Sequence, residues 1–447
     1  MFERPEEGEN AILVAVSFNY AEQHDLAEFS ELAKSAGATV LEVVQARRVA
    51  PHPRFFIGTG KVEELTELIS STGADLVLFD HQLSPAQERN LEGALNCRVV
   101  DRTRLILDIF AQRARSFEGK LQVELAQLEH QSTRLIRGWT HLERQKGGIG
   151  VRGGPGETQL ESDRRMIRLR IKQIHARLDK VRSQRKQSAK ARRRALLSVA
   201  SLVGYTNAGK STLFNVLTEA KAYAADQLFA TLDTTLRRIE VPGEHPVLLS
   251  DTVGFIRDLP PELVAAFQAT LEESKDATLL LHVIDASASE REEHISEVEQ
   301  TLARIGASDT PVLNIYNKID CLADTGPKIE RDGNGKAKAV WLSAKTGVGV
   351  NLLLQAIAEH LDEAKGRFLL TLPPKAGRAR AKLYELGAVI DDNPLDEGGW
   401  ALEITIAKGR WETLSRELGL SEMKIRPLDA NLQDLEEITD SSDITAL

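Results

Sequence analysis

The chain has 447 residues, of which 42% are hydrophobic and 28% are charged, and this composition argues against a protein built of membrane spans. Its length exceeds what one hydrophobic core usually holds and predicts about three domains. The net charge of −9, if evenly spread, would argue against nucleic acid binding. No run approaches the ~20 apolar residues needed to cross a bilayer. The acidic segment Met1–Glu7 predicts no secretory signal.

Residues 1–115 alternate apolar runs with helical patterns, which predicts an α/β layer with a mainly parallel sheet. Strands are expected at Ala11–Phe18, Thr39–Gln45, Leu76–Asp80 and Arg98–Asp101. Helices are expected at Asp25–Ala36, Val62–Ser71, Ser84–Leu95 and Arg102–Ala114.

Within this layer, the segment Ile57-Gly58-Thr59-Gly60-Lys61 resembles a phosphate-binding loop only superficially. Phe55 stands where the first glycine of that loop is required. A tight glycine turn at the start of a helix is therefore the favoured interpretation. A second nucleotide site in this domain is the alternative.

Residues 116–195 contain two apolar patterns with a spacing close to 3.5 residues, which is the period of a coiled-coil seam. The first pattern consists of Leu121, Leu125, Leu128 and Leu135, and the second of Leu160, Ile167, Ile171, Ile174, Leu178 and Val181. Between them, the glycine-rich segment Gly147–Gly156 cannot be helical. The sequence therefore predicts an antiparallel helical hairpin with a flexible tip.

The charge of the second hairpin helix differs from that of the rest of the chain. Residues 163–194 hold 14 Lys and Arg against two acids, a local charge of +12 that leaves −21 on the remainder. This asymmetry indicates a dedicated anion-binding element on an acidic protein. The alternative is a solvated coiled-coil face, but such a face would mix the two signs of charge.

Residues 196–366 carry five short segments in the order and spacing of a guanine-nucleotide site. The segments are Gly204-Tyr205-Thr206-Asn207-Ala208-Gly209-Lys210-Ser211, Phe229-Ala230-Thr231-Leu232-Asp233, Asp251-Thr252-Val253-Gly254, Asn317-Lys318-Ile319-Asp320 and Ser343-Ala344-Lys345. The first fits G-x-x-x-x-G-K-[ST], a loop whose backbone N–H groups cradle phosphates. A predicted strand at Leu197–Val203 and a predicted helix at Ser211–Glu219 supply the context that this loop needs.

The segment Asn317–Asp320 identifies the base. The carboxylate of Asp320 can accept hydrogen bonds from both N1–H and the N2 amine of guanine, and adenine offers no such pair of donors. The sequence therefore predicts that this domain binds GTP.

Phosphoryl transfer to water depends on positioning and on charge neutralisation. Lys210 is expected to reach the outer phosphates, and Ser211 to ligate Mg²⁺. Asp251 is expected to hold Mg²⁺ through water, and the Gly254 N–H to contact the γ-phosphate. Thr231 is the predicted second Mg²⁺-linked hydroxyl. The predicted catalytic residues are thus Lys210, Thr231 and Gly254, the predicted metal ligands are Ser211 and Thr231, and the rivals of Thr231 are Thr234 and Thr235.

One residue departs from the arrangement of Ras-like proteins. Phe255 follows Gly254, where those proteins place a water-orienting Gln. A phenyl ring cannot orient a nucleophilic water, so intrinsic hydrolysis should be slow without another device. The amide oxygen of Asn207, with backbone carbonyls, could hold a K⁺ ion against the phosphates. The equal alternative is that Asn207 merely fits a turn.

The rest of the GTP-binding region and the C-terminal part give weaker signals. Further strands are expected at Thr278–Asp285, Val312–Tyr316 and Val340–Ser343, and residues 367–447 are expected to form a small α+β domain. In that domain the pattern predicts strands at Arg378–Ile390 and Trp400–Ile406, a helix at Arg410–Leu418 and a mobile acidic tail at Asp434–Leu447. Cys97 and Cys321 have no metal-ligand spacing, so both are expected to be small core residues in a reducing cytosol.

Together these motifs resemble the HflX family of translational GTPases over nearly the whole chain. The resemblance is carried by Ile57–Lys61, by the glycine-rich segment Gly147–Glu157, by Phe229–Asp233 and by Asp251–Phe255. The glycine-rich segment is the most specific of these. The implied architecture is an α/β P-loop GTPase domain preceded by an N-terminal α/β domain and a helical hairpin, and followed by the small C-terminal domain.

The resemblance also implies a function. Such a protein would be a cytoplasmic, Mg²⁺-dependent GTP hydrolase, expected to be a monomer, that binds the large ribosomal subunit and its rRNA. It would place its hairpin near the peptidyl-transferase region and split stalled or idle ribosomes under stress. The family also implies nucleotide binding in the N-terminal domain, which Phe55 opposes. Two alternatives stay open, a regulatory GTP switch that needs an external activating protein and a GTPase partner of an RNA-modification system.

Overall fold

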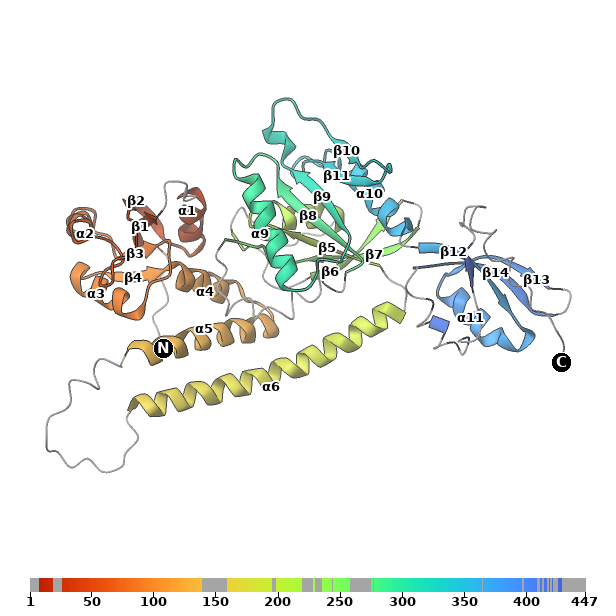
Figure 1. The fold of residues 1–447 in the computed structure, drawn as a ribbon, viewed down its shortest axis with the longest axis horizontal. Helices are drawn as coiled ribbons and strands as arrows, with labels where there is room; N and C mark the ends of the chain where they lie inside the picture. Colours follow the sequence, from red (N-terminus) through yellow and green to blue (C-terminus); the bar gives the residue numbers. More distant parts are fainter. Residues whose placement is uncertain are drawn as a thin grey trace.

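The structure is a computed structural model. It describes residues 8–18, 26–138, 159–194, 198–218, 228–229, 235–242, 244–257, 275, 277–363, 365–395, 398–407, 411, 414–415, 418, 420 and 425–427. These residues form three β-sheets that follow one another along an elongated molecule, with two long helices beside the first two sheets (Figure 1). The predicted α/β class, in which the first two sheets are mainly parallel, is confirmed.

The first sheet has four parallel strands in the order β2-β1-β3-β4. The strands are β1 (Asn10–Ser17), β2 (Thr39–Arg47), β3 (Leu76–Phe79) and β4 (Arg98–Asp101). The helices are α1 (Leu26–Ser35), α2 (Thr59–Thr72), α3 (Pro85–Leu95) and α4 (Arg102–Arg113). Side chains of α1 and α4 pack on one face and those of α2 and α3 on the other, so β1 is buried on both sides. All eight predicted elements are confirmed, with ends that differ by at most three residues.

The segment that resembles a phosphate loop begins a helix. Gly58 is the N-cap residue of α2, and Gly60 and Lys61 lie in its first turn. The Lys61 ammonium bonds to Glu64 of the same helix at 2.9 Å. The segment thus begins a helix, as the glycine-turn interpretation expects, and the alternative of a second nucleotide site stays a prediction.

The second sheet has seven strands in the order β10-β11-β9-β8-β5-β7-β6. The strands are β5 (Val199–Gly204), β6 (Thr235–Val241), β7 (Glu244–Asp251), β8 (Leu279–Asp285), β9 (Val312–Asn317), β10 (Lys328–Arg331) and β11 (Ala337–Trp341). The five inner strands are parallel, and the edge strands β6 and β10 are antiparallel to their neighbours. The helices are α7 (Lys210–Thr218), α9 (Arg291–Arg304) and α10 (Val350–Glu363), with the short helix η2 at Ile319–Cys321.

This topology fixes where a ligand can bind. Strand β5 lies between β7 and β8, so strands that follow it in the chain lie on both of its sides. At such a point a crevice forms at the carboxyl ends of the parallel strands. The predicted strand Val340–Ser343 was shifted, because β11 ends at Trp341. Ser343 instead lies in a turn, in which its N–H donates to the carbonyl oxygen of Val348 at 2.9 Å.

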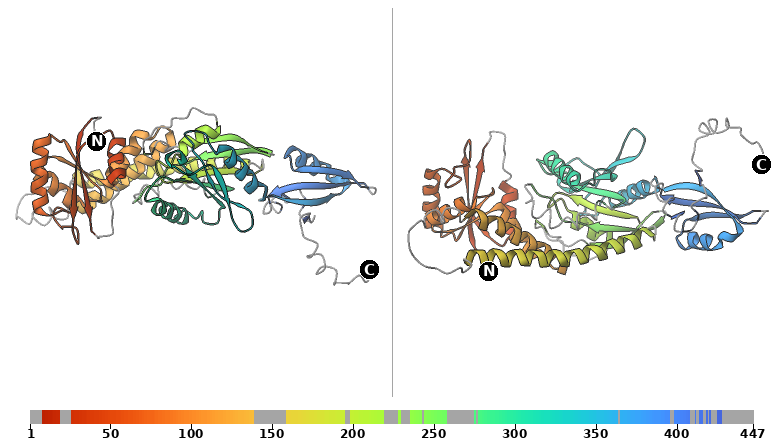
Figure 2. Two further views of the ribbon diagram at one scale, coloured as in Figure 1. Left: turned by 90° about the horizontal axis from the view of Figure 1, so that it is seen from above. Right: turned by 60° about the horizontal axis from the view of Figure 1, so that its bottom comes forward.

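The helical hairpin consists of α5 (Phe117–Gly138) and α6 (Gln159–Arg194), which lie side by side in Figure 1. Their seam is one buried cluster, formed by Leu121, Leu125, Leu128, Ile171, Ile174 and Leu178. The predicted seam is confirmed for these residues, whereas the side chains of Leu135 and Leu160 and the segment Gly147–Gly156 lie outside the described residues. Helix α6 continues past α5 and runs along the second sheet (Figure 2).

The third sheet is antiparallel, in the order β13-β14-β12-β15. Its strands are β12 (Lys365–Leu372), β13 (Val389–Pro394), β14 (Trp400–Ala407) and β15 (Arg426–Pro427), with the short helix η3 (Pro374–Ala376) and helix α11 (Gly377–Glu385). The predicted strand at Arg378–Ile390 was largely wrong. Ala379 and Leu383, four positions apart, are both buried on one face of α11, and four-residue spacing belongs to a helix. Most of the predicted helix Arg410–Leu418 and all of Asp434–Leu447 lie outside the described residues.

The first two sheets share part of their buried interior. One buried cluster is continuous from the first sheet to the second and includes Phe29, Phe110, Val203, Phe229 and Phe255. Among the helices within the described ranges, none has a stretch long and apolar enough to span a lipid bilayer.

Candidate nucleotide-binding site

The phosphate loop Gly204–Ser211 joins the end of β5 to the first turn of α7, so that helix N–H groups face the loop. Gly204 has φ 149° and Gly209 has φ 94°. A Cβ atom at Gly204 would lie 2.2 Å from the carbonyl oxygen of Val283, and one at Gly209 would lie 2.2 Å from Nδ2 of Asn317. Both positions require glycine, which explains the pattern in physical terms.

Lys210 is buried beneath this loop. Its Nζ donates to the carbonyl oxygens of Gly204 at 3.0 Å and Tyr205 at 2.6 Å. Burial lowers the pKa of Lys210 to about 8, although the nearby Asp251 carboxylate acts in the opposite direction. An anionic phosphate near Nζ would stabilise the ammonium and raise this pKa again.

Ser211 and Asp251 lie together at the carboxyl ends of the central strands. The Ser211 hydroxyl donates to Oδ2 of Asp251 at 3.1 Å. The next residue, Thr252, is buried and donates its hydroxyl to the carbonyl oxygen of Leu202 at 2.6 Å, which fixes the segment after β7. A hydroxyl and a carboxylate side by side are the oxygen donors that Mg²⁺ prefers, so these residues fit that ion.

The segment after Asp251 contacts the phosphate loop closely. A Cβ atom at Gly254 would lie 2.9 Å from Cγ2 of Thr206 and 3.0 Å from Nζ of Lys210. The Phe255 N–H donates to the carbonyl oxygen of Gly204 at 3.1 Å, and its own carbonyl accepts from Thr206 N–H at 2.7 Å. The Phe255 ring is 2% exposed and belongs to the continuous buried cluster, so it is not placed to orient a water molecule.

The predicted base-reading segments meet beside the phosphate loop. Asn317 Nδ2 donates to the carbonyl oxygen of Ala208 at 2.8 Å, and Asn317 Oδ1 accepts the N–H of Ala344 at 2.8 Å. Asn317 thus ties three predicted segments together. The Ser343 hydroxyl donates to Oδ1 of Asp320 at 2.6 Å, which orients the carboxylate that is expected to read guanine.

Lys318 adopts the left-handed conformation, with φ 68°, between Asn317 and Ile319. Its Nζ pairs with Oδ2 of Asp285 at 2.7 Å. Burial alone would raise the pKa of Asp285, but hydrogen bonds from Lys318 and Ser287 outweigh it and hold the pKa below its ordinary value. His282 lies in β8, three positions before Asp285. It is neutral at pH 7, because burial and the Lys210 charge lower its pKa to about 4.

Several predicted residues remain without a described position. Ala230, Thr231, Leu232, Asp233 and Thr234 lie outside the described residues, so the Mg²⁺-linked threonine stays a prediction. Phe229 is 3% exposed, with its ring centroid 4.6 Å from that of Phe110 in α4. Thr235, the remaining rival, begins β6 and pairs with Asp251 in the strand ladder.

Asn207 and the cysteines also bear on the sequence interpretation. Asn207 is exposed and has φ 58°, a conformation that Asn tolerates better than most residues. The turn interpretation is thereby satisfied, and a role in K⁺ binding stays a prediction. The core prediction was wrong for Cys321, which is exposed in η2 beside Asp320 because this short helix lies at the surface. Cys97 is half-buried.

A second set of residues at the site was not signalled by any sequence pattern. The Tyr205 hydroxyl donates to Glu28 of α1 and accepts the N–H of Arg257 at 3.0 Å. A cavity of about 200 Å³ lies between α1, the phosphate loop, the end of β8 and α9. Tyr205 and Glu28 are 177 positions apart, and no local pattern signals a contact at such a separation.

Comparison with known proteins agrees with this geometry. Residues 23–111 match a family described as GTP-binding GTPase N-terminal, residues 113–192 match GTP-binding GTPase Middle Region, and residues 199–318 match 50S ribosome-binding GTPase. Among solved structures, a GDP complex of a protein called SsGBP is 26% identical with a TM-score of 0.46, and the match covers 78% of this chain and 97% of that one.

Two curated relatives match nearly end to end. A protein named GTPase HflX from Escherichia coli is 55% identical over 418 residues, which cover 93% of this chain and 98% of the relative. A GTPase HflX from Caldanaerobacter subterraneus is 45% identical, and the match covers 91% and 93%. The phosphate loop and the predicted base-reading segments converge in the structure, and these matches span nearly the whole chain. This protein therefore belongs to the HflX family and hydrolyses GTP.

Proposed function

We propose that this GTPase acts in the cytoplasm on the large ribosomal subunit, and that GTP binding and hydrolysis drive the dissociation or rescue of stalled or idle ribosomes under stress. The matched family is described as ribosome-binding, and the relatives carry the name HflX. The observation that carries the proposal is the distribution of charge on α6.

The basic residues of α6 whose side chains the structure describes include two groups. Arg170 pairs with Glu124 of α5 at 2.6 Å, and Arg185 pairs with Glu118 of α5 at 2.9 Å. These arginines are neutralised within the hairpin. A second group is exposed to solvent and consists of Arg168, Lys172, Arg177 and Lys180. A face that sorts its charges in this way offers a row of cations to a polyanion such as rRNA.

We also propose a division of labour along the chain. Residues 1–115 form an N-terminal α/β domain, residues 116–195 the RNA-binding hairpin, residues 196–366 the GTPase domain and residues 367–447 a small C-terminal domain. The supporting observations are the three separate sheets and the long α5–α6 pair between the first two.

At the nucleotide, the proposed roles follow from the contacts. Lys210 exchanges its bonds to the Gly204 and Tyr205 carbonyls for phosphate oxygens, and the Gly254 N–H contacts the γ-phosphate. Ser211, Thr231 and Asp251 would hold Mg²⁺, which when bound neutralises charge on the phosphates. Asp320 accepts the two guanine donors, and Asn317 keeps the base-reading loop against the phosphate loop.

Cosedimentation with purified ribosomal subunits tests the proposal. We expect retention on large subunits to be strongest with a non-hydrolysable GTP analogue and weaker with GDP. In a light-scattering assay, GTP should then support the dissociation of intact ribosomes. Absence of large-subunit binding in every nucleotide state would overturn the proposal.

The proposed K⁺ site makes a separate prediction. Because the Phe255 ring is buried and cannot orient a water molecule, and because Asn207 offers an exposed amide, we expect subunit-stimulated hydrolysis to be faster in K⁺ than in Na⁺ at equal ionic strength. Asn207→Ala should remove most of this difference, and Asn215→Ala, in α7 outside the loop, should not. Equal parental rates in the two salts would refute the K⁺ role.

The depressed pKa of Lys210 predicts a pH dependence. In the free protein Lys210 loses its proton as the pH rises through about 8, whereas bound phosphate keeps it charged. GDP affinity should therefore fall about fourfold between about pH 7 and about pH 8.5. Lys210→Arg stays charged throughout and should lack this loss, whatever its absolute affinity. Parallel pH profiles of the two proteins in a titration would mean that another group titrates.

A further inference from the structure

Asp101 and Arg102 are consecutive residues where β4 ends and α4 begins, and we call them the β4–α4 junction. Their side chains contact different parts of the molecule. Asp101 bonds to the hairpin, and Arg102 bonds to residues that contact the phosphate loop. The junction therefore stands between the proposed RNA-binding element and the nucleotide.

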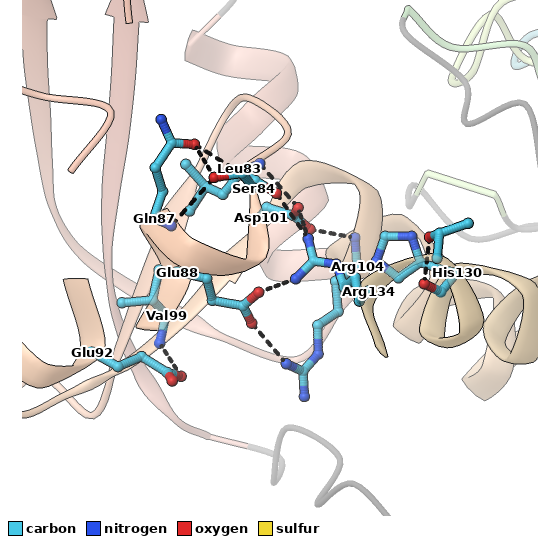
Figure 3. Close-up of polar contacts among 11 residues, drawn as sticks. Leu83, Ser84, Gln87, Glu88, Glu92, Val99, Asp101, Arg104, His130 and Arg134 are labelled. Carbon is cyan, nitrogen blue, oxygen red and sulfur yellow. Dashed lines mark hydrogen bonds and ion pairs between the residues drawn. The ribbon is translucent and has the colours of Figure 1, made fainter. Parts of the chain in front are cut away.

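On the hairpin side, Arg134 of α5 pairs with both Asp101 and Glu88 (Figure 3). Arg134 Nη2 also donates to the carbonyl oxygen of Leu83 at 3.2 Å. Asp101 Oδ1 accepts the N–H of Arg104 at 2.9 Å and so caps α4. The same carboxylate thus fixes the first turn of α4 and binds the hairpin.

On the nucleotide side, Arg102 is 3% exposed and is held by two acids. It pairs with Glu28 of α1, and its Nη1 donates to Oδ1 of Asp80 at 2.6 Å. Burial alone would lower the pKa of Arg102, but these carboxylates outweigh it and raise the pKa. Arg102 Nη2 also donates to the carbonyl oxygen of Arg257 at 3.3 Å. Removing a partner of such a buried charge leaves the charge uncompensated in the interior and is strongly destabilising.

The partners of Arg102 contact two nucleotide loops, the phosphate loop Gly204–Ser211 and the segment Asp251–Arg257. Glu28 accepts the Tyr205 hydroxyl, and Tyr205 is the second residue of the phosphate loop. Asp80 pairs with Arg257 at 3.4 Å, and Arg257 lies three positions after Gly254. The N–H of Arg257 donates to the Tyr205 hydroxyl at 3.0 Å, so the two loops are also joined to each other.

We propose that the β4–α4 junction couples the helical hairpin to the nucleotide loops. RNA bound along α6 moves α5 relative to α4, changes the Arg134–Asp101 pair and shifts Arg102. That shift repositions Tyr205 and Arg257 and changes nucleotide affinity. By reciprocity, the nucleotide state changes the affinity of the hairpin for RNA by the same factor. This inference rests on the proposed function, since it requires the hairpin to bind ribosomal RNA.

The test measures the affinity of a fluorescent non-hydrolysable GTP analogue with and without saturating purified large subunits. The ratio of the two dissociation constants is the coupling factor. We expect it to fall several-fold toward one in Asp101→Asn, which keeps a side chain that can cap α4, and in Arg134→Gln. Tyr205→Phe should also lower the coupling factor, because it removes the hydroxyl that bonds to Glu28 and to the Arg257 N–H. Arg98→Gln breaks the 3.1 Å pair with Glu9 at the other end of β4 and should leave the factor unchanged.

The outcomes separate the two proposals. A parental protein that binds no large subunit refutes the proposed function. A parental protein that binds and couples, with an unchanged factor in Asp101→Asn and Arg134→Gln, overturns only the junction. Hydrogen exchange on the unaltered chain gives an answer that does not depend on how the variants fold. Subunit binding should change protection at Arg257 and Tyr205, and unchanged protection at both would also overturn the junction.

Discussion

Asp320→Asn is expected to weaken GTP binding by about 30- to 150-fold, because losing a charge-assisted pair of hydrogen bonds costs ~2–3 kcal/mol. Binding of xanthosine triphosphate should become stronger, since xanthine carries an oxygen where guanine carries its N2 amine, and the new amide can donate to it. The Ser343 hydroxyl, 2.6 Å from Asp320 Oδ1, can orient either side chain. The variant therefore tests base recognition with little change in the shape of the site.

A titration with both nucleotides measures this exchange. Asp324→Asn is the matched control, because Asp324 is an exposed carboxylate in the same surface region but outside the base-reading segment. It should leave both affinities unchanged. If Asp320→Asn binds GTP as tightly as the parent, guanine is read by other residues.

Deleting Gly147–Gly156 should abolish ribosome splitting while leaving subunit binding largely intact. The segment has a single basic residue, Arg152, so it can supply little electrostatic affinity. Its proposed place at the hairpin tip gives it a mechanical role instead. The subunit-stimulated part of GTP hydrolysis should be lost together with splitting, and the basal rate should remain.

Replacing Arg192, Arg193 and Arg194 with Gln should instead change the salt dependence of subunit binding. Each phosphate contact contributes about −0.7 to −0.9 to the slope of log affinity against log salt, so this variant should bind with a flatter slope. Its nucleotide affinity should equal that of the parent. A loop deletion that still splits ribosomes at the parental rate would exclude the tip from the mechanism. An unchanged salt slope in the triple variant would exclude its arginines from RNA contact.

The loop between β5 and α7 was predictable from sequence because its steric requirements are local. At Gly204 and Gly209 a Cβ atom would lie 2.2 Å from a neighbouring atom. Only glycine fits such positions, so the requirement is visible in the sequence itself. Alternating strands and helices in the first sheet were predictable for the same reason, since apolar periodicity follows directly from burial.

Contacts between distant segments were not predictable in this way. Glu28 and Arg102 look like ordinary surface residues in their own helices, and only the folded chain places Arg102 against Glu28 and Glu28 against Tyr205. The error at Arg378–Ile390 has another cause. A helix and a strand meet there within thirteen residues, and the burial of Ala379 and Leu383 against the third sheet decides where one ends. Short segments of this kind depend on tertiary packing more than on propensity.

The buried cluster that passes from the first sheet to the second has a consequence for stability. Phe110 from the N-terminal side and Phe229 and Phe255 from the GTPase side share one interior, whereas the third sheet has a separate core of its own. Parts that share a core lose their packing together when either one melts, and parts with separate cores can melt alone. On heating, the chain should therefore behave as two cooperative units rather than three. A substitution such as Phe110→Ala would then destabilise the GTPase part, although Phe110 belongs to the other sheet.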